Sequence, residues 1–171
     1  MENVKKTFTD FEKKSVLDLG CGYGWHCLYA AEHGAEKVIG IDLSKKMLAV
    51  AREKNTSDKV TYLQGSIEDI DFPAEQFDVV ISSLALHYVA SFENIAKKVQ
   101  HILKKEGEFI FSVEHPVFTA SGSQEWITDE AGNICHFPVD NYFYEGPRHT
   151  HFLGEPVTKY HKTLMMGKEL S

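Results

Sequence analysis

The 171-residue sequence has no long run of apolar residues, no run of more than two Lys or Arg residues, and only three cysteines. Without an apolar segment of bilayer-spanning length, or a signal-peptide stretch after Met1, we expect no membrane partner. A net charge of −7 without a basic cluster argues against nucleic acid as a partner. Three cysteines cannot form a framework of disulfide pairs, which favours a reducing compartment. We therefore expect a cytoplasmic protein.

What the sequence does contain is a glycine-rich segment directly after a predicted strand. Residues 16–19 (VLDL) lead into GCGYG at 20–24, and a helix is predicted from there. Glycine allows a backbone with positive φ and lets a ligand approach closely, and a helix N-terminus offers N–H groups to a negatively charged group. We predict a ligand-binding loop here, in preference to a tight turn alone.

Two acidic residues accompany this loop. Asp42 ends a second predicted strand, about 20 residues after the first glycine, where folds of this type bind ribose hydroxyls. Alternatively, Asp42 caps the helix that follows it. Asp18 lies inside a buried strand, where an unpaired carboxylate is costly. We expect Asp18 to accept hydrogen bonds from loop N–H groups and to reach an ammonium group of the ligand through water.

The first 115 residues alternate between predicted strands and helices. Strands are predicted near 15–19, 37–41, 59–63, 77–82 and 108–113, and helices near 24–33, 44–54 and 91–104. Ser44 and Ser91 are placed to cap the second and third helices, and Gly107 follows the third. Apolar runs without alternation, such as 79–81, are typical of parallel strands covered on both faces. We expect a doubly wound α/β sheet with its ligand at the carboxyl ends of the strands.

The spacing G-x-G-x-G, with Trp25 where a dinucleotide-binding motif has its third glycine, resembles motif I of the class I S-adenosylmethionine-dependent methyltransferases. Residues 64–73 resemble the family's adenine-binding turn, 76–88 its fourth strand and substrate-facing segment, and 103–111 its passage into the fifth strand. The resemblance covers residues 14–115. Ser66 stands where many relatives carry Asp, and its hydroxyl can still accept a hydrogen bond from the adenine amino group.

This resemblance implies a Rossmann-like, mostly parallel sheet of order 3-2-1-4-5 with helices on both faces. It implies methyl transfer from S-adenosylmethionine to a small-molecule acceptor, with S-adenosylhomocysteine as product. Carried over position by position, the cofactor-binding residues are Asp18, Gly20, Cys21, Gly22, Asp42, Leu43, Met47, Ser66, Ile67, Glu68 and Ser82.

Residues 116–160 differ in character, with many aromatic residues, histidines and turn signals and little strand periodicity. We expect a single domain over 1–171, with a cofactor-binding core at 14–115 and an acceptor lid at 116–160. An aromatic-packed flap without a ligand role is the alternative. Relative to the family, the chain has little room for a sixth and seventh strand or for more than a short N-terminal helix, which suggests a shortened member. The fifth strand would then be a bare edge through which two copies could pair.

His87 and His115 are the candidates for a general base, which is needed only if the acceptor must lose a proton. His87 follows the fourth predicted strand and His115 ends the fifth, and either could be purely structural. We expect Cys21 to be a backbone donor in the loop and Cys27 to be a packed helix residue, rather than nucleophiles. No metal is expected, because zinc-ligand spacing is lacking in the set Cys135, His136, His149 and His151.

Two other functions remain open. An NAD-dependent oxidoreductase would also use a glycine loop and a second-strand acid, although Trp25 replaces its third glycine. A shortened, non-catalytic S-adenosylmethionine-binding module would keep the cofactor pocket and lack a closed acceptor site.

Overall fold

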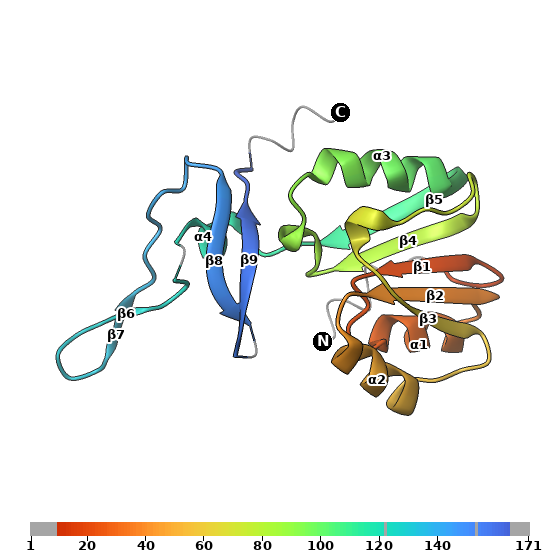
Figure 1. The fold of residues 1–171 in the computed structure, drawn as a ribbon, viewed down its shortest axis with the longest axis horizontal. Helices are drawn as coiled ribbons and strands as arrows, with labels where there is room; N and C mark the ends of the chain where they lie inside the picture. Colours follow the sequence, from red (N-terminus) through yellow and green to blue (C-terminus); the bar gives the residue numbers. More distant parts are fainter. Residues whose placement is uncertain (1–9, 122, 153, 165–171) are drawn as a thin grey trace. The chain divides into compact units, whose positions relative to one another are not determined.

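The computed structural model describes residues 10–121, 123–152 and 154–164 (Figure 1). These residues form two compact units. One comprises the described residues up to Leu86 together with Ser91–Ser112, and the other comprises His87–Ala90 together with the described residues from Val113 onward. Residues 1–9, where the sequence leaves room for no more than a short helix, and most of the segment after the expected lid lie outside the described residues.

The first unit is built on a five-stranded parallel sheet in the order β3-β2-β1-β4-β5. This confirms the predicted Rossmann-like fold and its strand order. The strands are β1 (Ser15–Leu19), β2 (Lys37–Asp42), β3 (Val60–Gln64), β4 (Phe77–Ser83) and β5 (Leu103–Ser112).

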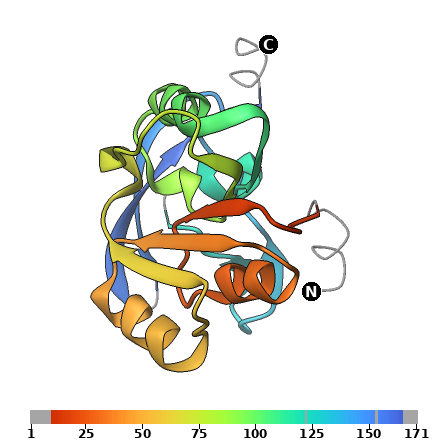
Figure 2. The ribbon, with the colours of Figure 1, turned by 90° about the vertical axis from the view of Figure 1, so that its right-hand side faces the viewer.

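Three α-helices and two short 3-10 turns connect these strands. They are α1 (Trp25–Glu32), α2 (Lys45–Lys54), η1 (Ile67–Asp69), η2 (Leu86–Tyr88) and α3 (Phe92–Ile102). Figures 1 and 2 show α1 and α2 together beside β1–β3, and α3 on the β4–β5 side. The predicted caps are confirmed: Ser44 accepts a hydrogen bond from the Met47 N–H at 3.3 Å, and Ser91 from the Asn94 N–H at 3.2 Å.

Residues on both faces of the sheet are buried, which explains the apolar runs without alternation. Val16 and Val79 belong to one apolar cluster with Leu48 of α2. Their chain neighbours Leu17 and Val80 are fully buried as well. Because successive strand side chains point to opposite faces, both faces of β1 and β4 are covered.

The end of α3 differs from the prediction. The helix ends at Ile102, two residues early, and the chain enters β5 directly at Leu103. The residue with positive φ is Glu106, not Gly107. A Cβ at Gly107 would lie 2.9 Å from the Lys104 carbonyl oxygen, so glycine is needed there for close backbone packing rather than to end the helix.

The second unit contains α4 (Pro116–Ala120) and two antiparallel hairpins. The hairpin strands are β6 (Ile127–Thr128) with β7 (Ile134–His136), and β8 (Gly146–Phe152) with β9 (Glu155–His161). The sequence does not predict these strands, because the buried positions of β8 and β9 are the polar residues Thr150, Lys159 and His161. Within the described ranges, β8 and β9 pair with each other and not with the five-stranded sheet.

Polar contacts hold the interior of the second unit. His161 is fully buried, with Nδ1 2.8 Å from the Thr119 hydroxyl and Nε2 2.7 Å from the Tyr142 carbonyl oxygen. The Arg148 guanidinium donates to the Ala120 carbonyl at 2.9 Å and to further backbone carbonyls around it. Directional hydrogen bonds thus organise this unit, where a small apolar core would otherwise be needed.

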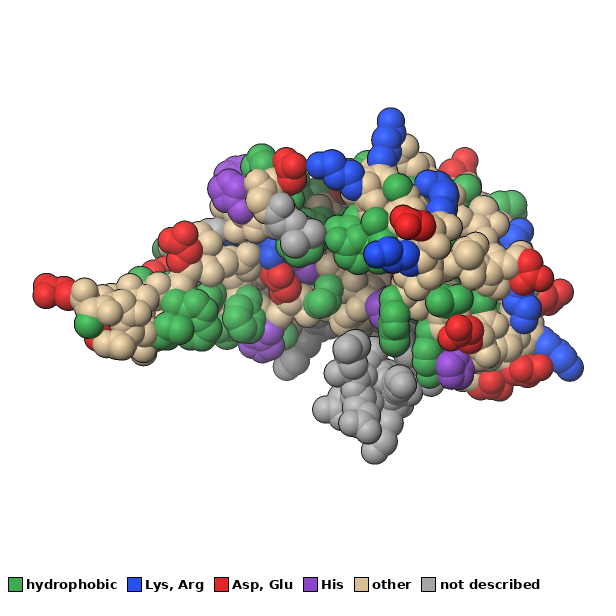
Figure 3. Space-filling model, turned by 90° about the horizontal axis from the view of Figure 1, so that it is seen from below, with side chains coloured by type: hydrophobic (Ala, Val, Ile, Leu, Met, Phe, Trp, Pro, Cys, Tyr) green, Lys and Arg blue, Asp and Glu red, His purple; other side chains and the backbone are tan. Residues whose placement is uncertain are grey.

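Apolar side chains gather on the surface of the part that carries β6 and β7 (Figure 3). The rings of Phe118 and Trp126 each pack against Phe137 with centroids 5.2 Å apart. The aromatic cluster is therefore locally ordered, and whether the segment moves as a lid stays a prediction. None of the helices in the described chain has both the length and the apolar character needed to cross a bilayer.

Candidate cofactor-binding site

The glycine loop follows β1 at the carboxyl edge of the sheet. Gly20, Gly22 and Gly24 have φ of 77°, 52° and 78°, as the sequence predicts for a loop that needs glycine. A Cβ at Gly20 would collide with the Ala85 side chain, and one at Gly24 with the Tyr62 hydroxyl. At Gly22, no atom of the described residues lies within 4 Å of that position. Gly22 is thus the loop glycine whose backbone is open to a ligand.

Asp42 fixes the conformation of this loop from the end of β2. Its Oδ2 accepts a hydrogen bond from the Gly22 N–H at 2.8 Å, and its Oδ1 accepts one from the Ser44 N–H at 2.8 Å. The cap of α2 is Ser44, so Asp42 supports the helix start without being its cap. Each carboxylate oxygen has a second acceptor position, which leaves Asp42 able to bind a pair of ligand hydroxyls.

Asp18 does not make the loop contacts expected from the sequence. Its side chain lies on the face of β1 that packs against α1, where its Oδ2 accepts a hydrogen bond from the Cys27 thiol at 3.4 Å. The loop N–H groups of Gly20 and Cys21 donate instead to the Ile41 carbonyl, at 2.8 and 2.9 Å. These bonds continue the pairing of β1 with β2 past the end of β1. The two N–H groups already have an acceptor and do not donate to Asp18.

The second oxygen of Asp18 is an orphaned buried acceptor. The residue is buried, and its Oδ1 has no hydrogen-bond partner among the residues that the structure describes. Burial raises the pKa of this carboxyl to about 7, against the smaller opposite effect of the Cys27 thiol. A nearby cation would favour the ionised form, so the site suits a positively charged ligand group.

The two loop-side cysteines are packing residues. Cys27 is fully buried, and its hydrogen bond with the Cys21 thiol, together with burial, raises its pKa far above the ordinary range. Both sulfur atoms approach Gly40, where a Cβ would lie within 3 Å of each. A thiol held neutral in this way is a poor nucleophile, as the sequence analysis expected.

The second arm of the predicted site is the turn η1 with the residue before it. Ser66 caps this turn, its hydroxyl accepting a hydrogen bond from the Glu68 N–H at 3.1 Å. The turn is joined to β2 through the Gly65 N–H, which donates to the Asp42 carbonyl at 3.1 Å. Ser66 and Ile67 are half-buried and Glu68 is exposed, so all three retain accessible surface.

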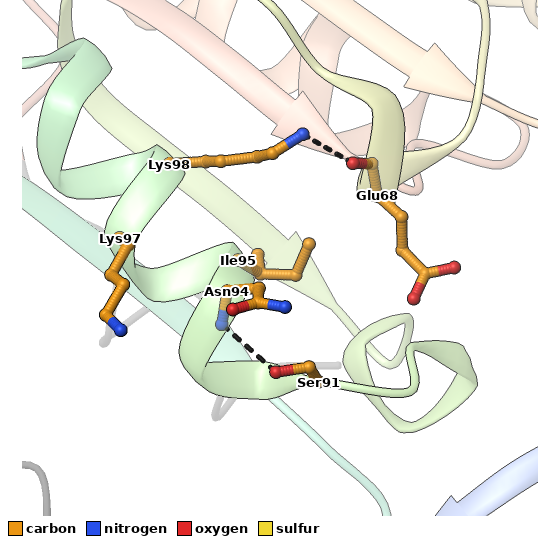
Figure 4. Close-up of a pocket in the computed structure, with 6 residues that line it drawn as sticks. All are labelled: Glu68, Ser91, Asn94, Ile95, Lys97 and Lys98. Atoms are coloured by element: carbon orange, nitrogen blue, oxygen red, sulfur yellow. Dashed lines mark hydrogen bonds between the residues drawn. The ribbon is translucent and has the colours of Figure 1, made fainter.

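A pocket of about 260 Å³ lies between η1 and the first turns of α3 (Figure 4). Its lining residues are Glu68, Ser91, Asn94, Ile95, Lys97 and Lys98. The glycine loop and Asp42 are not among them. The pocket therefore marks the outer side of the η1 arm rather than the loop itself.

The remaining predicted cofactor residues differ in accessibility. Leu43 is largely exposed after β2, and Met47 is half-buried on α2. Ser82 is fully buried, and its hydroxyl donates to the Leu19 carbonyl at 2.9 Å. Ser82 therefore ties β4 to β1, and any effect of this residue on a ligand would be indirect.

The two histidine candidates have structural partners. His87 is buried, its Nδ1 faces the Glu114 N–H at 3.5 Å, and its Nε2 lies 3.8 Å from Glu114 Oε1. A backbone N–H can only donate, so Nδ1 is the acceptor and the ring proton is on Nε2. Burial lowers the His87 pKa, although Glu114 acts in the opposite direction. His115 is exposed and caps α4, its Nδ1 accepting from the Val117 N–H at 3.2 Å.

His87 belongs to a buried polar network that the sequence does not reveal. The Lys159 ammonium is 4% exposed and donates to Glu114 Oε1 at 2.6 Å and to Gln124 Oε1 at 3.0 Å. It also lies 5.8 Å from the centroid of the Tyr88 ring. Burial opposes the charge of Glu114, but Lys159, His87 and Gln124 together hold its pKa below the ordinary value. No sequence pattern signals that this lysine is buried in the β8–β9 hairpin.

The described residues contain no group of three or more His, Cys, Asp or Glu side chains that could hold a metal ion. Three features of these residues fit a nucleoside with a cationic tail: an open glycine, a strand-end carboxylate and an orphaned buried acceptor.

Comparison with known proteins agrees with this arrangement. A family model described as a methyltransferase domain matches residues 17–111, which are mostly those of the first unit. A structure from Listeria monocytogenes, described as a candidate S-adenosylmethionine-dependent methyltransferase, shares 60% identity with a TM-score of 0.90, over 98% of this chain and 79% of that one. An S-adenosylmethionine-dependent methyltransferase from Mesorhizobium loti shares 38% identity with a TM-score of 0.85, over 98% and 76%.

Sequence relatives are longer proteins. An uncharacterised protein of Haemophilus influenzae is 35% identical over 157 residues, which are 88% of this chain and 62% of that protein. Protein arginine N-methyltransferase 1 of Saccharomyces cerevisiae is 35% identical over 72% of this chain and 37% of its own length. The chain thus spans less than two thirds of these relatives. Its fold, its glycine loop and these matches place it in the class I S-adenosylmethionine-dependent methyltransferase family.

Proposed function

We propose that this chain binds S-adenosylmethionine and transfers its methyl group to a small-molecule acceptor. The observation that carries the proposal is the open backbone at Gly22, held by Asp42, and the orphaned buried oxygen of Asp18 at the end of the neighbouring strand supports it. The family to which the chain belongs supports the same donor.

The residues divide the binding between them. The Gly22 backbone allows close approach, and the Asp42 carboxylate, already oriented by two N–H groups, accepts the ribose hydroxyls. Asp18 provides a carboxylate for a cationic group. Ser66 and Ile67 on the η1 arm face the adenine, while Leu43 and Met47 offer apolar surface.

The acceptor side relies on positioning rather than on a histidine base. The donor, when bound, supplies a methyl group on a sulfonium centre whose leaving thioether is neutral, so orientation of the acceptor provides much of the acceleration. His87 offers no lone pair toward an acceptor in this conformation, because Nδ1 faces the Glu114 N–H and Nε2 carries the proton. The same proposal includes residues 116–160 as a lid that covers the acceptor.

The proposed oligomeric state rests on the outer edge of β5. β5 pairs with β4 on one side, and no described strand pairs with its other side. An unpaired edge is a site for strand pairing, so the proposed assembly is a homodimer through β5, located in the cytoplasm. Sedimentation at several protein concentrations tests this. A monomer at all concentrations would exclude the dimer.

Calorimetric titration tests the donor. S-adenosylhomocysteine should bind and NAD should not. Incubation with S-adenosylmethionine labelled in its methyl group, together with a panel of small amines, alcohols and thiols, should then label one acceptor class. Binding without transfer to any acceptor would favour the non-catalytic module. Binding of NAD alone would overturn the proposal.

A further inference from the structure

Lys98 of α3 is bonded to the turn η1, which lies about 30 residues earlier in the chain. Its ammonium donates to the Glu68 carbonyl at 2.6 Å and to the Ile70 carbonyl at 3.3 Å (Figure 4). These carbonyls belong to the end of the turn that begins at Ser66 and Ile67. The side chain thus spans the pocket between the helix and the turn.

The turn has few regular hydrogen bonds of its own. A 3-10 turn of three residues has poor hydrogen-bond geometry and no further helical turns to support it. Within the turn, the Asp69 N–H donates to the Ser66 carbonyl at 3.2 Å and the Glu68 N–H donates to the Ser66 hydroxyl at 3.1 Å. Bonds from an ammonium are stronger than neutral ones, so those of Lys98 contribute a large share of the order of this turn.

We propose that Lys98 is a positioning residue for the adenine end of the cofactor site. This inference rests on the proposed function. By holding two carbonyls at the end of η1, Lys98 fixes the direction in which Ser66 and Ile67 present their polar groups. It makes adenine recognition dependent on a helix that contributes no adenine-binding residue of its own.

The neighbouring lysine provides a matched control. Lys97 lies on the same turn of α3, is exposed, and pairs with Glu93 on its own helix. It has the same charge and helix propensity as Lys98 and makes no described hydrogen bond to η1. Lys97→Met therefore removes one positive charge from the same turn of α3 and leaves the hydrogen bonds between Lys98 and η1 in place. Lys98→Arg keeps the positive charge and introduces a planar guanidinium that can donate to both carbonyls.

The experiment measures binding of two ligands, S-adenosylhomocysteine and its inosine analogue, in which the adenine amino group is replaced by an oxo group. The wild-type chain should prefer the adenine ligand about tenfold, the factor that one hydrogen bond with good geometry provides. In Lys98→Met, affinity for S-adenosylhomocysteine should fall about tenfold, and the preference should fall to about twofold or less. Lys97→Met should match the wild type, and Lys98→Arg should retain most of the preference.

Hydrogen exchange of the ligand-free protein gives a readout that does not depend on the donor. Amides 66–70 should exchange faster in Lys98→Met, while those of β1 and β4 stay protected. Equal loss of both ligands with an unchanged preference, or unchanged binding, would overturn the inference while the proposed function stands. Failure of the wild-type chain to bind S-adenosylhomocysteine would overturn the proposed function itself.

Discussion

The substitution Asp18→Asn should make the stability of the ligand-free protein less dependent on pH. The folded-state pKa of Asp18, about 7, lies above its ordinary value of 3.8. The protonated carboxyl therefore contributes stability in full below about pH 4, and this contribution is lost as the pH rises through 7, because only the unfolded chain ionises easily. The interval of about 3 pH units corresponds to about 4 kcal/mol at 1.36 kcal/mol per unit.

The variant removes this titration while keeping an acceptor for the Cys27 thiol. The asparagine NH₂ gains no evident partner in place of the orphaned Oδ1, which costs about 1–3 kcal/mol at every pH. Urea unfolding should therefore show that the free energy of unfolding of the variant, relative to that of the wild type, increases by several kcal/mol between pH 4.5 and pH 8. A stability difference that stays constant with pH would refute the assignment of a raised pKa to Asp18.

The same carboxyl should link donor binding to pH. A cationic ligand group requires the ionised form, so wild-type affinity for S-adenosylmethionine should rise as the pH increases through about 7. Calorimetry in buffers of different ionisation enthalpy should detect proton release on binding near pH 6.5. Asp18→Asn should bind more weakly and without proton release.

Further predictions concern the loop and the second unit. Gly22→Val should abolish donor binding with a small loss of stability, since φ of 52° disfavours a β-branched residue and the space is open; a folded variant that binds normally would contradict a ligand role for the loop. Asp42→Ala should weaken binding by about 1.5–3 kcal/mol in titration, and unchanged affinity would remove the ribose assignment. Lys159→Met should destabilise the chain by about 2–3 kcal/mol at pH 7 and by less as the pH falls, because Glu114 loses the ammonium that lowers its pKa and so protonates more readily in the variant; a loss of stability that stays the same at every pH would argue against the ion pair. Hydrogen exchange between residues 120 and 150 should be fast in the free protein and slower with both substrates, and core-like protection without ligand would favour a fixed flap.

The first unit is predictable from sequence because its local signals agree with one another. Apolar runs, the serine caps and the glycine spacing support the same series of elements, right-handed crossovers favour a doubly wound sheet, and the strand order is the one that the family resemblance implies. The prediction that Asp18 accepts hydrogen bonds from the loop N–H groups was wrong, because sequence position does not show which of two carboxylates faces the loop. Strand alternation directs Asp18 toward α1, and it is Asp42 that meets the Gly22 N–H.

The second unit is not predictable in the same way. Hydrophobic periodicity reveals strands only where the buried positions are apolar. In β8 and β9 these positions are Thr150, Lys159 and His161, whose burial depends on partners such as Glu114 and Thr119 far away in the sequence. Such contacts form only once the hairpin has folded, so no local pattern records them.

The three loop glycines are required for different physical reasons. Gly20 and Gly24 are restricted by the protein itself, since Ala85 and Tyr62 occupy the space that a side chain would need. Gly22 is restricted only by its backbone conformation and by what binds there, and its left-handed φ is one that Asn or Asp also adopts. A descendant of this chain that lost its ligand would be free to exchange Gly22 for Asn while keeping the other two glycines. The middle position of the motif is therefore the one whose identity reports, across a lineage, whether the loop is still in use.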